Sequence, residues 1–193
     1  MRNIFYTSML LSILILFFAE TGMGDDTNFR QTKWGMTKEQ VKSSEPLKVS
    51  EERNDILGYK SSVINKDVFI IYFFAGNQLT RARYFLAESH TNKNDFIRDY
   101  KDFKKILTKK YGPSETEDKI WKNDLYKDDY SNWGMAISLG HLVYMSTWET
   151  EDTEIAAMLL GENYDVSCVV EYTSKNLKEL EDKAKEQKAM DNF

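Results

Sequence analysis

The side chains that most often bind metals or act as nucleophiles are scarce in this chain of 193 residues, which has two histidines, His90 and His141, and one cysteine, Cys168. Zinc sites need several histidine and cysteine ligands at short spacings, and no such spacing is present. Each histidine lies at a predicted strand end or turn, so we expect both as exposed turn residues. Cys168 lies on an alternating apolar stretch, which favours a buried structural thiol over a nucleophile. The sequence therefore predicts no metal site and no cofactor.

Carboxylates are abundant and could bind a hard cation or form a catalytic pair. The densest cluster is Glu149, Glu151, Asp152 and Glu154. Its spacing does not define the oxygen geometry that Ca²⁺ requires, so we expect a solvated turn. Phosphate-binding loops, nucleophile elbows and dinucleotide fingerprints are absent, so the chain is expected not to be an enzyme. An unrecognised hydrolase stays open as an alternative, because carboxylate pairs are defined in space rather than by sequence motifs.

Aromatic residues are the remaining excess, with 4 Trp, 11 Tyr and 11 Phe. Most fall on predicted strand faces or on a helix stripe. Trp121, Tyr126, Tyr130 and Trp133 instead bracket a polar segment, residues 122–132, that we expect to be a loop. Aromatic side chains at such a place could contact a protein or a glycan. The alternative interpretation is an aromatic lid that covers the edge of the chain's own sheet.

The first 24 residues have the layout of a secretory signal peptide. Arg2 precedes an apolar run over residues 9–19, and Gly22 and Gly24 could fill the small-residue positions before cleavage. The run is short for a membrane span, which needs about 20 apolar residues, although an uncleaved anchor stays possible. Cys168 is the only cysteine, so no lipid-accepting cysteine follows this segment. We therefore expect a periplasmic or secreted protein.

Charge and cysteine usage narrow the possible partners. The formal net charge is −5, and nucleic-acid binding depends mainly on Lys and Arg neutralising phosphates, so a nucleic-acid partner is not expected. The basic residues between positions 93 and 110 alternate with acids, which indicates a mixed-charge helix face. One cysteine cannot form an intrachain disulfide, so the stability of the fold must come from its core.

The first part of the chain predicts one short helix followed by strands. Thr37 and Gln40 form a capping box at the helix start, and the helix must end before Pro46. Residues 47–56 are polar and are expected to be a loop or a frayed strand. Apolar runs and turn residues then predict strands at residues 59–64, 68–74 and 80–86.

The second part repeats this order. A helix is predicted over residues 94–111 from its apolar stripe, with Gly112 and Pro113 as a stop signal. The end of the chain, residues 176–193, is predicted to be a charged surface helix or tail. Between them, strands are predicted at residues 119–122, 133–139, 142–148, 155–160 and 165–172.

The grouping of helices and strands predicts an α+β fold with helices packed on one face of an antiparallel sheet. Residues 25–175 are expected to form one domain of two tandem helix-plus-sheet units, at about 27–90 and 91–174. The tripeptide Trp-Gly-Met occurs at Trp34 and again at Trp133, but the second copy is expected to enter a strand. The tripeptide therefore does not mark the repeat.

A short motif resembles a known family. Residues 35–41, GMTKEQV, followed by Pro46, resemble the helix start of the small outer-membrane-assembly lipoprotein family. The tandem layout is similar to the β-lactamase-inhibitor-protein fold. Phe29-Arg30 followed by Trp34-Gly35-Met36 resembles a group of uncharacterised bacterial exported proteins. These resemblances imply bacterial export and an α+β fold.

The expected function is a non-enzymatic interaction module of the envelope or of the secreted fraction. It would bind another envelope protein through a sheet face or through the loop at residues 122–132. It would contact a membrane only if its N-terminal segment stays uncleaved. Alternatives are a protein that binds a small apolar ligand between sheet and helices, and the unrecognised hydrolase.

Overall fold

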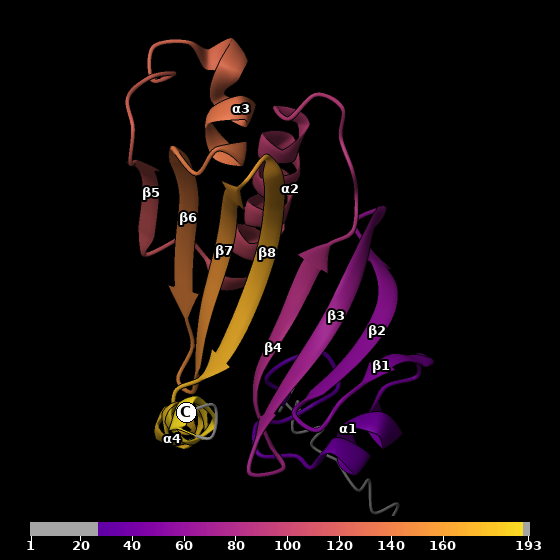
Figure 1. The fold of residues 1–193 in the computed structure, drawn as a ribbon. Helices are drawn as coiled ribbons and strands as arrows, with labels where there is room; N and C mark the ends of the chain where they lie inside the picture. Colours follow the sequence, from indigo (N-terminus) through magenta and orange to yellow (C-terminus); the bar gives the residue numbers. More distant parts are fainter. Residues whose placement is uncertain (1–26, 191–193) are drawn as a thin grey trace, which may run out of the picture.

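A computed structural model describes residues 27–190 (Figure 1). The predicted signal peptide, residues 1–24, lies outside the described residues. The described part is an α+β fold in which eight strands form one antiparallel sheet accompanied by four α-helices. The elements in chain order are α1 Lys38–Ser44, β1 Val49–Glu52, β2 Ile56–Val63, β3 Lys66–Ala75, β4 Gln78–Leu86, α2 Asp95–Tyr111, β5 Thr116–Trp121, η1 Tyr130–Asn132, α3 Trp133–Ser138, β6 Leu142–Glu149, β7 Thr153–Glu162, β8 Asp165–Ser174 and α4 Lys178–Met190.

The strands run in the order β1-β2-β3-β4-β8-β7-β6-β5 across the sheet. Each half is a meander of neighbouring strands, and the halves meet where β4 pairs with β8. That pairing extends from Arg81 opposite Thr173 to Phe85 opposite Val169. The strand β8 thus joins the second half of the sheet to the first by pairing with β4.

The predicted capping box at the start of α1 is confirmed. The Thr37 side chain accepts the Gln40 N–H at 3.3 Å, and the Gln40 side chain accepts the Thr37 N–H at 2.8 Å. The helix ends at Ser44, two residues before Pro46. Val41 on its inner side is fully buried and anchors the helix to the core.

The strand predictions of the first half hold with shifted ends. The segments at 68–74 and 80–86 lie within β3 and β4. Residues 47–56 contain β1, which pairs with β2, so this segment is more ordered than a loop. Because β1 has few apolar side chains, its pairing partner rather than its own composition defines it.

In the second half of the sheet one face is covered by α2, which lies behind β7 and β8 in the view of Figure 1. Phe96, Tyr100, Phe103 and Leu107 form the buried stripe that the sequence predicted. The Tyr100 hydroxyl contacts the Ser146 hydroxyl at 2.8 Å, which places α2 against β6. We call this side of the sheet the covered face.

The predicted strand at residues 133–139 is wrong, because this segment is the helix α3. Ala136 and Ile137 are adjacent in sequence and both buried, which a half-covered strand would not produce. Gly134 allows α3 to approach the start of α2 closely, and its N–H donates to Asn94 Oδ1 at 2.6 Å. The alternation of apolar residues fits a strand locally, but tertiary packing selects the helix.

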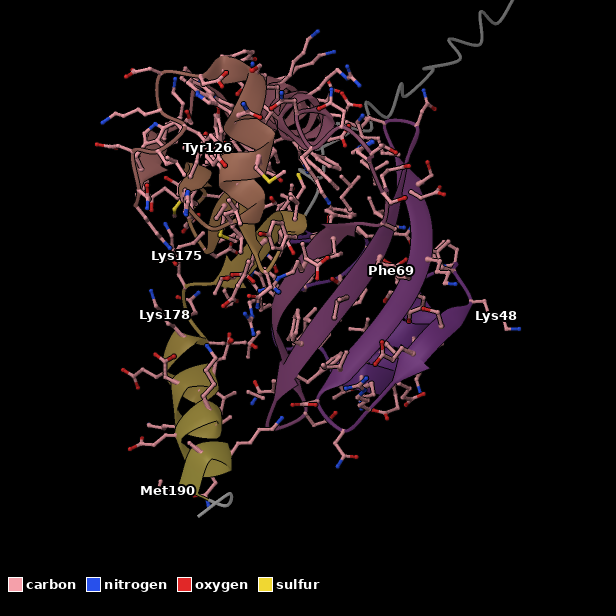
Figure 2. All side chains as sticks on the ribbon, turned by 45° about the horizontal axis from the view of Figure 1, so that its top comes forward. Lys48, Phe69, Tyr126, Lys175, Lys178 and Met190 are labelled. Atoms are coloured by element: carbon pink, nitrogen blue, oxygen red, sulfur yellow. The ribbon has the colours of Figure 1, made fainter. Side chains whose placement is uncertain are left out.

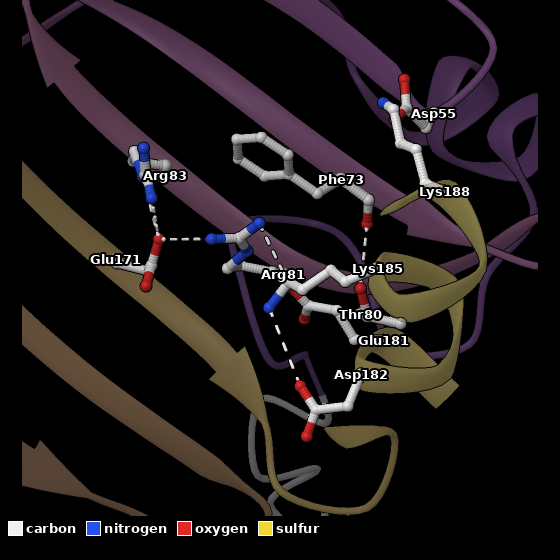
Figure 3. A network of polar contacts seen from close by, with 10 residues as sticks. All are labelled: Asp55, Phe73, Thr80, Arg81, Arg83, Glu171, Glu181, Asp182, Lys185 and Lys188. Carbon is white, nitrogen blue, oxygen red and sulfur yellow. Dashed lines mark hydrogen bonds and ion pairs between the residues drawn. The ribbon is translucent and has the colours of Figure 1, made fainter. Parts of the chain in front are cut away.

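The helix α4 differs from the others in its placement. It is seen end-on in Figure 1, below the lower ends of β7 and β8. Glu181, its one buried residue, pairs with Arg81 at 3.1 Å. Arg81 alternates with the buried Ala82 along β4, so α4 touches the face opposite to α2, which we call the open face (Figure 3).

Candidate functional site

The four aromatic residues singled out from the sequence lie together at the end of β5 and the start of α3. The ring centroids of Trp121 and Trp133 are 5.6 Å apart, and those of Tyr130 and Trp133 are 4.8 Å apart. Tyr126 stacks on His141 with 6.2 Å between centroids. We call Trp121, Tyr126, Tyr130 and Trp133 the aromatic cluster.

The inner part of the aromatic cluster is a lid, as the second interpretation proposed. Trp121, Tyr126 and Trp133 pack against the hydrophobic core. Trp133 lies 6.5 Å from Tyr144 between ring centroids, and burial raises the pKa of the Tyr144 hydroxyl. These three rings therefore cover the end of the sheet, and Trp133 also supports the exposed ring of Tyr130.

The outer part of the aromatic cluster is accessible. Tyr130 is 59% exposed, and Leu125 on the same loop is 68% exposed. The Lys119 ammonium lies 5.2 Å from the Trp133 ring centroid and adds a charged rim. Leu125 and Tyr130 lie on one short loop beside the half-buried rings of Trp121 and Trp133, and a contiguous apolar patch is what marks an interaction site, so Tyr130 and Leu125 are the candidate contact residues. Leu125 was not singled out from the sequence, because a lone leucine in a polar segment carries no signal.

The loop that carries Tyr130 is held by its own hydrogen bonds. Asp129 accepts the Ser131 N–H at 3.1 Å and the Asn132 side-chain amide at 2.7 Å. The side-chain bonds from Ser131 and then Asn132 lower the pKa of Asp129, because they favour its ionised form. The Trp133 indole N–H donates to the Lys127 carbonyl at 3.1 Å. The loop is therefore preorganised rather than waiting to be ordered by a partner.

A group that resembles catalytic machinery lies elsewhere, where α2 meets the start of β3. Asp99 pairs with Lys66 at 2.6 Å and with His90 Nε2 at 2.5 Å. Burial alone would lower the pKa of Lys66, but its hydrogen bonds to Asp99 and Asp102 raise the pKa above the ordinary value. This group therefore combines the carboxylate of Asp99, the imidazole of His90 and the ammonium of Lys66.

Cys168 does not complete this group as a nucleophile. Cys168 is the thiol that Asp99 influences, but burial raises the pKa of Cys168 and the thiol is not accessible. The prediction of a buried structural cysteine is confirmed. The histidines lie outside the helices and strands, as the turn prediction implied, but they are half-buried rather than exposed, because His90 pairs with Asp99 and His141 stacks against Tyr126.

The acidic turn that could have held a cation is engaged in contacts within the chain. Asp152 accepts from the Asn28 amide at 2.6 Å, and Glu149 pairs with Lys175 at 2.6 Å. Glu154 lies 3.4 Å from Lys178. Within residues 27–190, no group of three or more His, Cys, Asp or Glu side chains is arranged to hold a metal ion.

One ionic group was missed by sequence reasoning. The side chain of Glu45 is fully buried, and it accepts from Arg30 Nε at 2.7 Å and from the Tyr72 hydroxyl. Burial and then the bond to Glu45 raise the pKa of Tyr72. Every partner in this group belongs to the chain, so its role is to tie the N-terminal segment to β3. No local sequence pattern predicts this group, because Arg30, Glu45 and Tyr72 belong to three separate segments of the chain.

Comparison with known proteins gives no relative from which a role could be transferred. No protein-family model, no curated protein and no solved structure matches the chain. Among the helices of residues 27–190, none has the length and apolar character needed to cross a membrane. The functional assignment therefore rests on the geometry of the molecule.

Proposed function

We propose that this protein is a non-enzymatic interaction module that binds a partner protein through the aromatic cluster. The observation that carries this proposal is the exposure of Tyr130 and Leu125 on a hydrogen-bonded loop that is backed by Trp133 and Trp121. Tyr and Trp dominate the energetics of protein interfaces, since they bury a large area with few rotatable bonds. A preorganised loop also reduces the ordering entropy that binding must overcome.

The rim of the aromatic cluster favours a protein over an apolar small molecule. Lys119 lies over the Trp133 ring, and Asp124 and Lys127, which pair at 3.2 Å, belong to the same loop as Leu125 and Tyr130. An apolar centre with a charged rim is the usual anatomy of a protein interface. Leu125 and Tyr130 project from the surface, whereas a small apolar ligand would need an enclosed pocket.

The proposed setting is the bacterial periplasm or the secreted fraction, with another envelope protein as partner. The signal-peptide layout of residues 1–24 supports this setting, and the net charge of −5 argues against a nucleic-acid partner. Contact with a membrane is proposed only for a chain whose N-terminal segment remains attached.

We also propose that the fold comprises two tandem units, at about residues 27–90 and 91–174, with the helices α1 and α2 of these units on one face of the sheet and α4 as a separate C-terminal surface helix. The strand order supports this division, because β1–β4 and β5–β8 each occupy one half of the sheet. Gly112 ends α2 before the second half, much as Pro46 follows α1 in the first. The aromatic cluster then belongs to the outer edge of the second unit.

The test is a binding measurement with variants that change only the exposed side chains. The purified chain is used to capture partners from an envelope extract, and the captured protein is then titrated against Tyr130→Ala, Leu125→Ala and Ile106→Ala. Ile106 is the control, because it is 44% exposed on α2, away from the loop. We expect each loop variant to weaken binding at least tenfold, as loss of about 1.4 kcal/mol implies. Equal binding by all three variants would refute the proposal.

A further inference from the structure

The helix α4 lies against the open face of the sheet without burying an apolar side chain. Along its length only Glu181 is buried, whereas Leu180 is partly exposed and Ala184 and Met190 are exposed. A helix that belongs to the core of a domain normally buries an apolar stripe, as α2 does. Figure 2 shows α4 from the side, running from Lys178 to Met190 beside the sheet. The apolar contribution that usually holds a helix on a sheet is therefore small here.

A hollow, rather than a packed contact, separates α4 from the sheet. A cavity of about 520 Å³ lies between the helix and the strands β2, β3 and β4. Ile56, Phe73 and Arg81 line the cavity from the sheet, and Ala184 and Lys185 line it from α4. Packed protein interiors contain few voids larger than a water molecule. The side chains of α4 therefore do not interdigitate with those of the sheet, and its polar contacts must hold it in place.

Ion pairs provide these polar contacts. Glu181 pairs with Arg81 of β4 at 3.1 Å, and Lys188, near the end of α4, pairs with Asp55 before β2 at 2.9 Å (Figure 3). The first pair is largely buried, whereas both partners of the second pair are exposed. Exposed pairs are weak and are screened by salt. The position of α4 therefore depends mainly on charge, and part of that charge is open to solvent.

Separation of the buried pair would leave neither charge without a partner. Arg81 also bonds to the Glu171 carboxylate of β8 at 3.2 Å, and Glu181 also pairs with Lys185 of α4 at 2.9 Å. Loss of a buried pair is costly chiefly when one of its charges is left unpaired. The Arg81 guanidinium also stacks on Phe73, 4.3 Å from the ring centroid, so its position does not depend on α4 alone. The helix can therefore leave the sheet and return without stranding a buried charge.

We propose that α4 is a strap that leaves the open face reversibly as the ionic strength rises, and that its release uncovers Phe73 and Arg81. The Debye length falls from about 10 Å at 0.1 M salt to about 3 Å at 1 M, so the exposed pair of Lys188 with Asp55 weakens over this range. Isolated helices as short as α4, which has 13 residues, are marginal in water. The released α4 therefore also loses its helical structure, so docking and helix formation are coupled.

Hydrogen exchange in sodium chloride of about 0.05 M and about 1 M tests the proposal. The protection factors of residues 181–190 should fall roughly tenfold at the higher salt, because α4 opens more often, whereas those of α2 should not change. Glu181→Gln should lower the protection of α4 already at the lower salt. Glu186→Gln is the matched control, because it removes the same charge from an exposed position of α4 that forms no ion pair within residues 27–190.

A distance measurement separates release of α4 from fraying of a helix that stays docked. Nitroxide labels are attached to a chain that carries Glu186→Cys on α4 and Lys60→Cys on β2, while the buried Cys168 stays unlabelled. Electron paramagnetic resonance should give one narrow distance at the lower salt. At the higher salt it should give a broad distribution, and the narrow distance should return after the salt is removed.

Three results would each overturn the proposal. The first is protection of α4 that responds neither to salt nor to Glu181→Gln. The second is an equal loss of protection in Glu181→Gln and Glu186→Gln, and the third is a narrow label distance that persists at the higher salt. The helix α4 and the aromatic cluster lie at opposite ends of the sheet in Figure 1, so none of these results decides the proposed function.

Discussion

Replacing Gly134 by alanine should destabilise the protein, although helix propensity predicts the opposite. Gly134 lies in the first turn of α3, where alanine is favoured over glycine by about 0.5–1 kcal/mol. A Cβ atom at this position would lie 2.3 Å from the Asn94 nitrogen and 2.7 Å from the Lys93 carbonyl oxygen. These are backbone atoms at the start of α2 and cannot rotate away. Either α3 or the start of α2 must shift.

The size of the effect follows from two losses. Overpacking of a tight contact costs about 1–3 kcal/mol, and displacement of α3 also loses the 2.6 Å bond from the Gly134 N–H to Asn94, worth about 1 kcal/mol. After subtraction of the gain in propensity, a net loss of about 1–3 kcal/mol remains. For a domain of this size, that lowers the Tm by roughly 2–12 °C.

Thermal unfolding followed by circular dichroism measures this change. Gly112→Ala is the control, because nothing lies within 4 Å of a Cβ there and only its φ of +89° opposes the substitution. It should cost about 1–2 kcal/mol from backbone strain, without displacing Trp133. The indole N–H signal of Trp133 in an NMR spectrum should therefore move in Gly134→Ala but not in Gly112→Ala, where the affected indole is that of Trp148, which donates to the Gly112 carbonyl at 2.9 Å. A Tm for Gly134→Ala at or above that of the unmodified protein would refute the packing argument.

Three further predictions concern the polar and thiol groups. Glu45→Gln should lower the free energy of unfolding in urea by about 3–5 kcal/mol, because Arg30 loses its buried counter-charge; an unchanged urea midpoint would contradict this. Cys168 should resist iodoacetamide at pH 8 in the folded protein and react fully in denaturant, because burial both shields the thiol and raises its pKa; rapid alkylation of the folded chain would contradict this. Hydrogen bonds lower the pKa of Asp129 below 3.8, so its ionised form stabilises the loop above about pH 4, and this contribution disappears as the pH falls through the folded pKa. The protection factors for hydrogen exchange at residues 129–132 should fall over that acid range in the unmodified chain but not in Asp129→Asn, and equal pH profiles of protection would contradict the assignment.

Local signals allowed part of the fold to be predicted from the sequence. The capping box of Thr37 and Gln40 acts within one turn, and the apolar stripe of α2 depends only on helical spacing. The strands β3 and β4 were predicted for the same reason, because alternation and turn residues lie within each strand. In these segments, local preference and tertiary packing agree.

Long-range contacts account for what the sequence did not predict. Residues 133–139 alternate like a strand, but the contact of Gly134 with Asn94 makes the segment a helix. The pairing of β4 with β8, and of Glu45 with Arg30, joins segments whose partners no local pattern identifies. The aromatic cluster was identified as a set, because its members bracket one polar segment. Its division into half-buried Trp121 and exposed Tyr130 depends on how that segment folds over β5 and α3.

The central claim is that the exposed part of the aromatic cluster contacts a partner protein. A photoreactive phenylalanine analogue at position 130 tests this claim most directly in cells that produce the protein, with the same analogue at position 106 of α2 as the control. The account predicts a covalent adduct with one defined protein from position 130 and none from position 106. No adduct from position 130, or the same adducts from both positions, would contradict it.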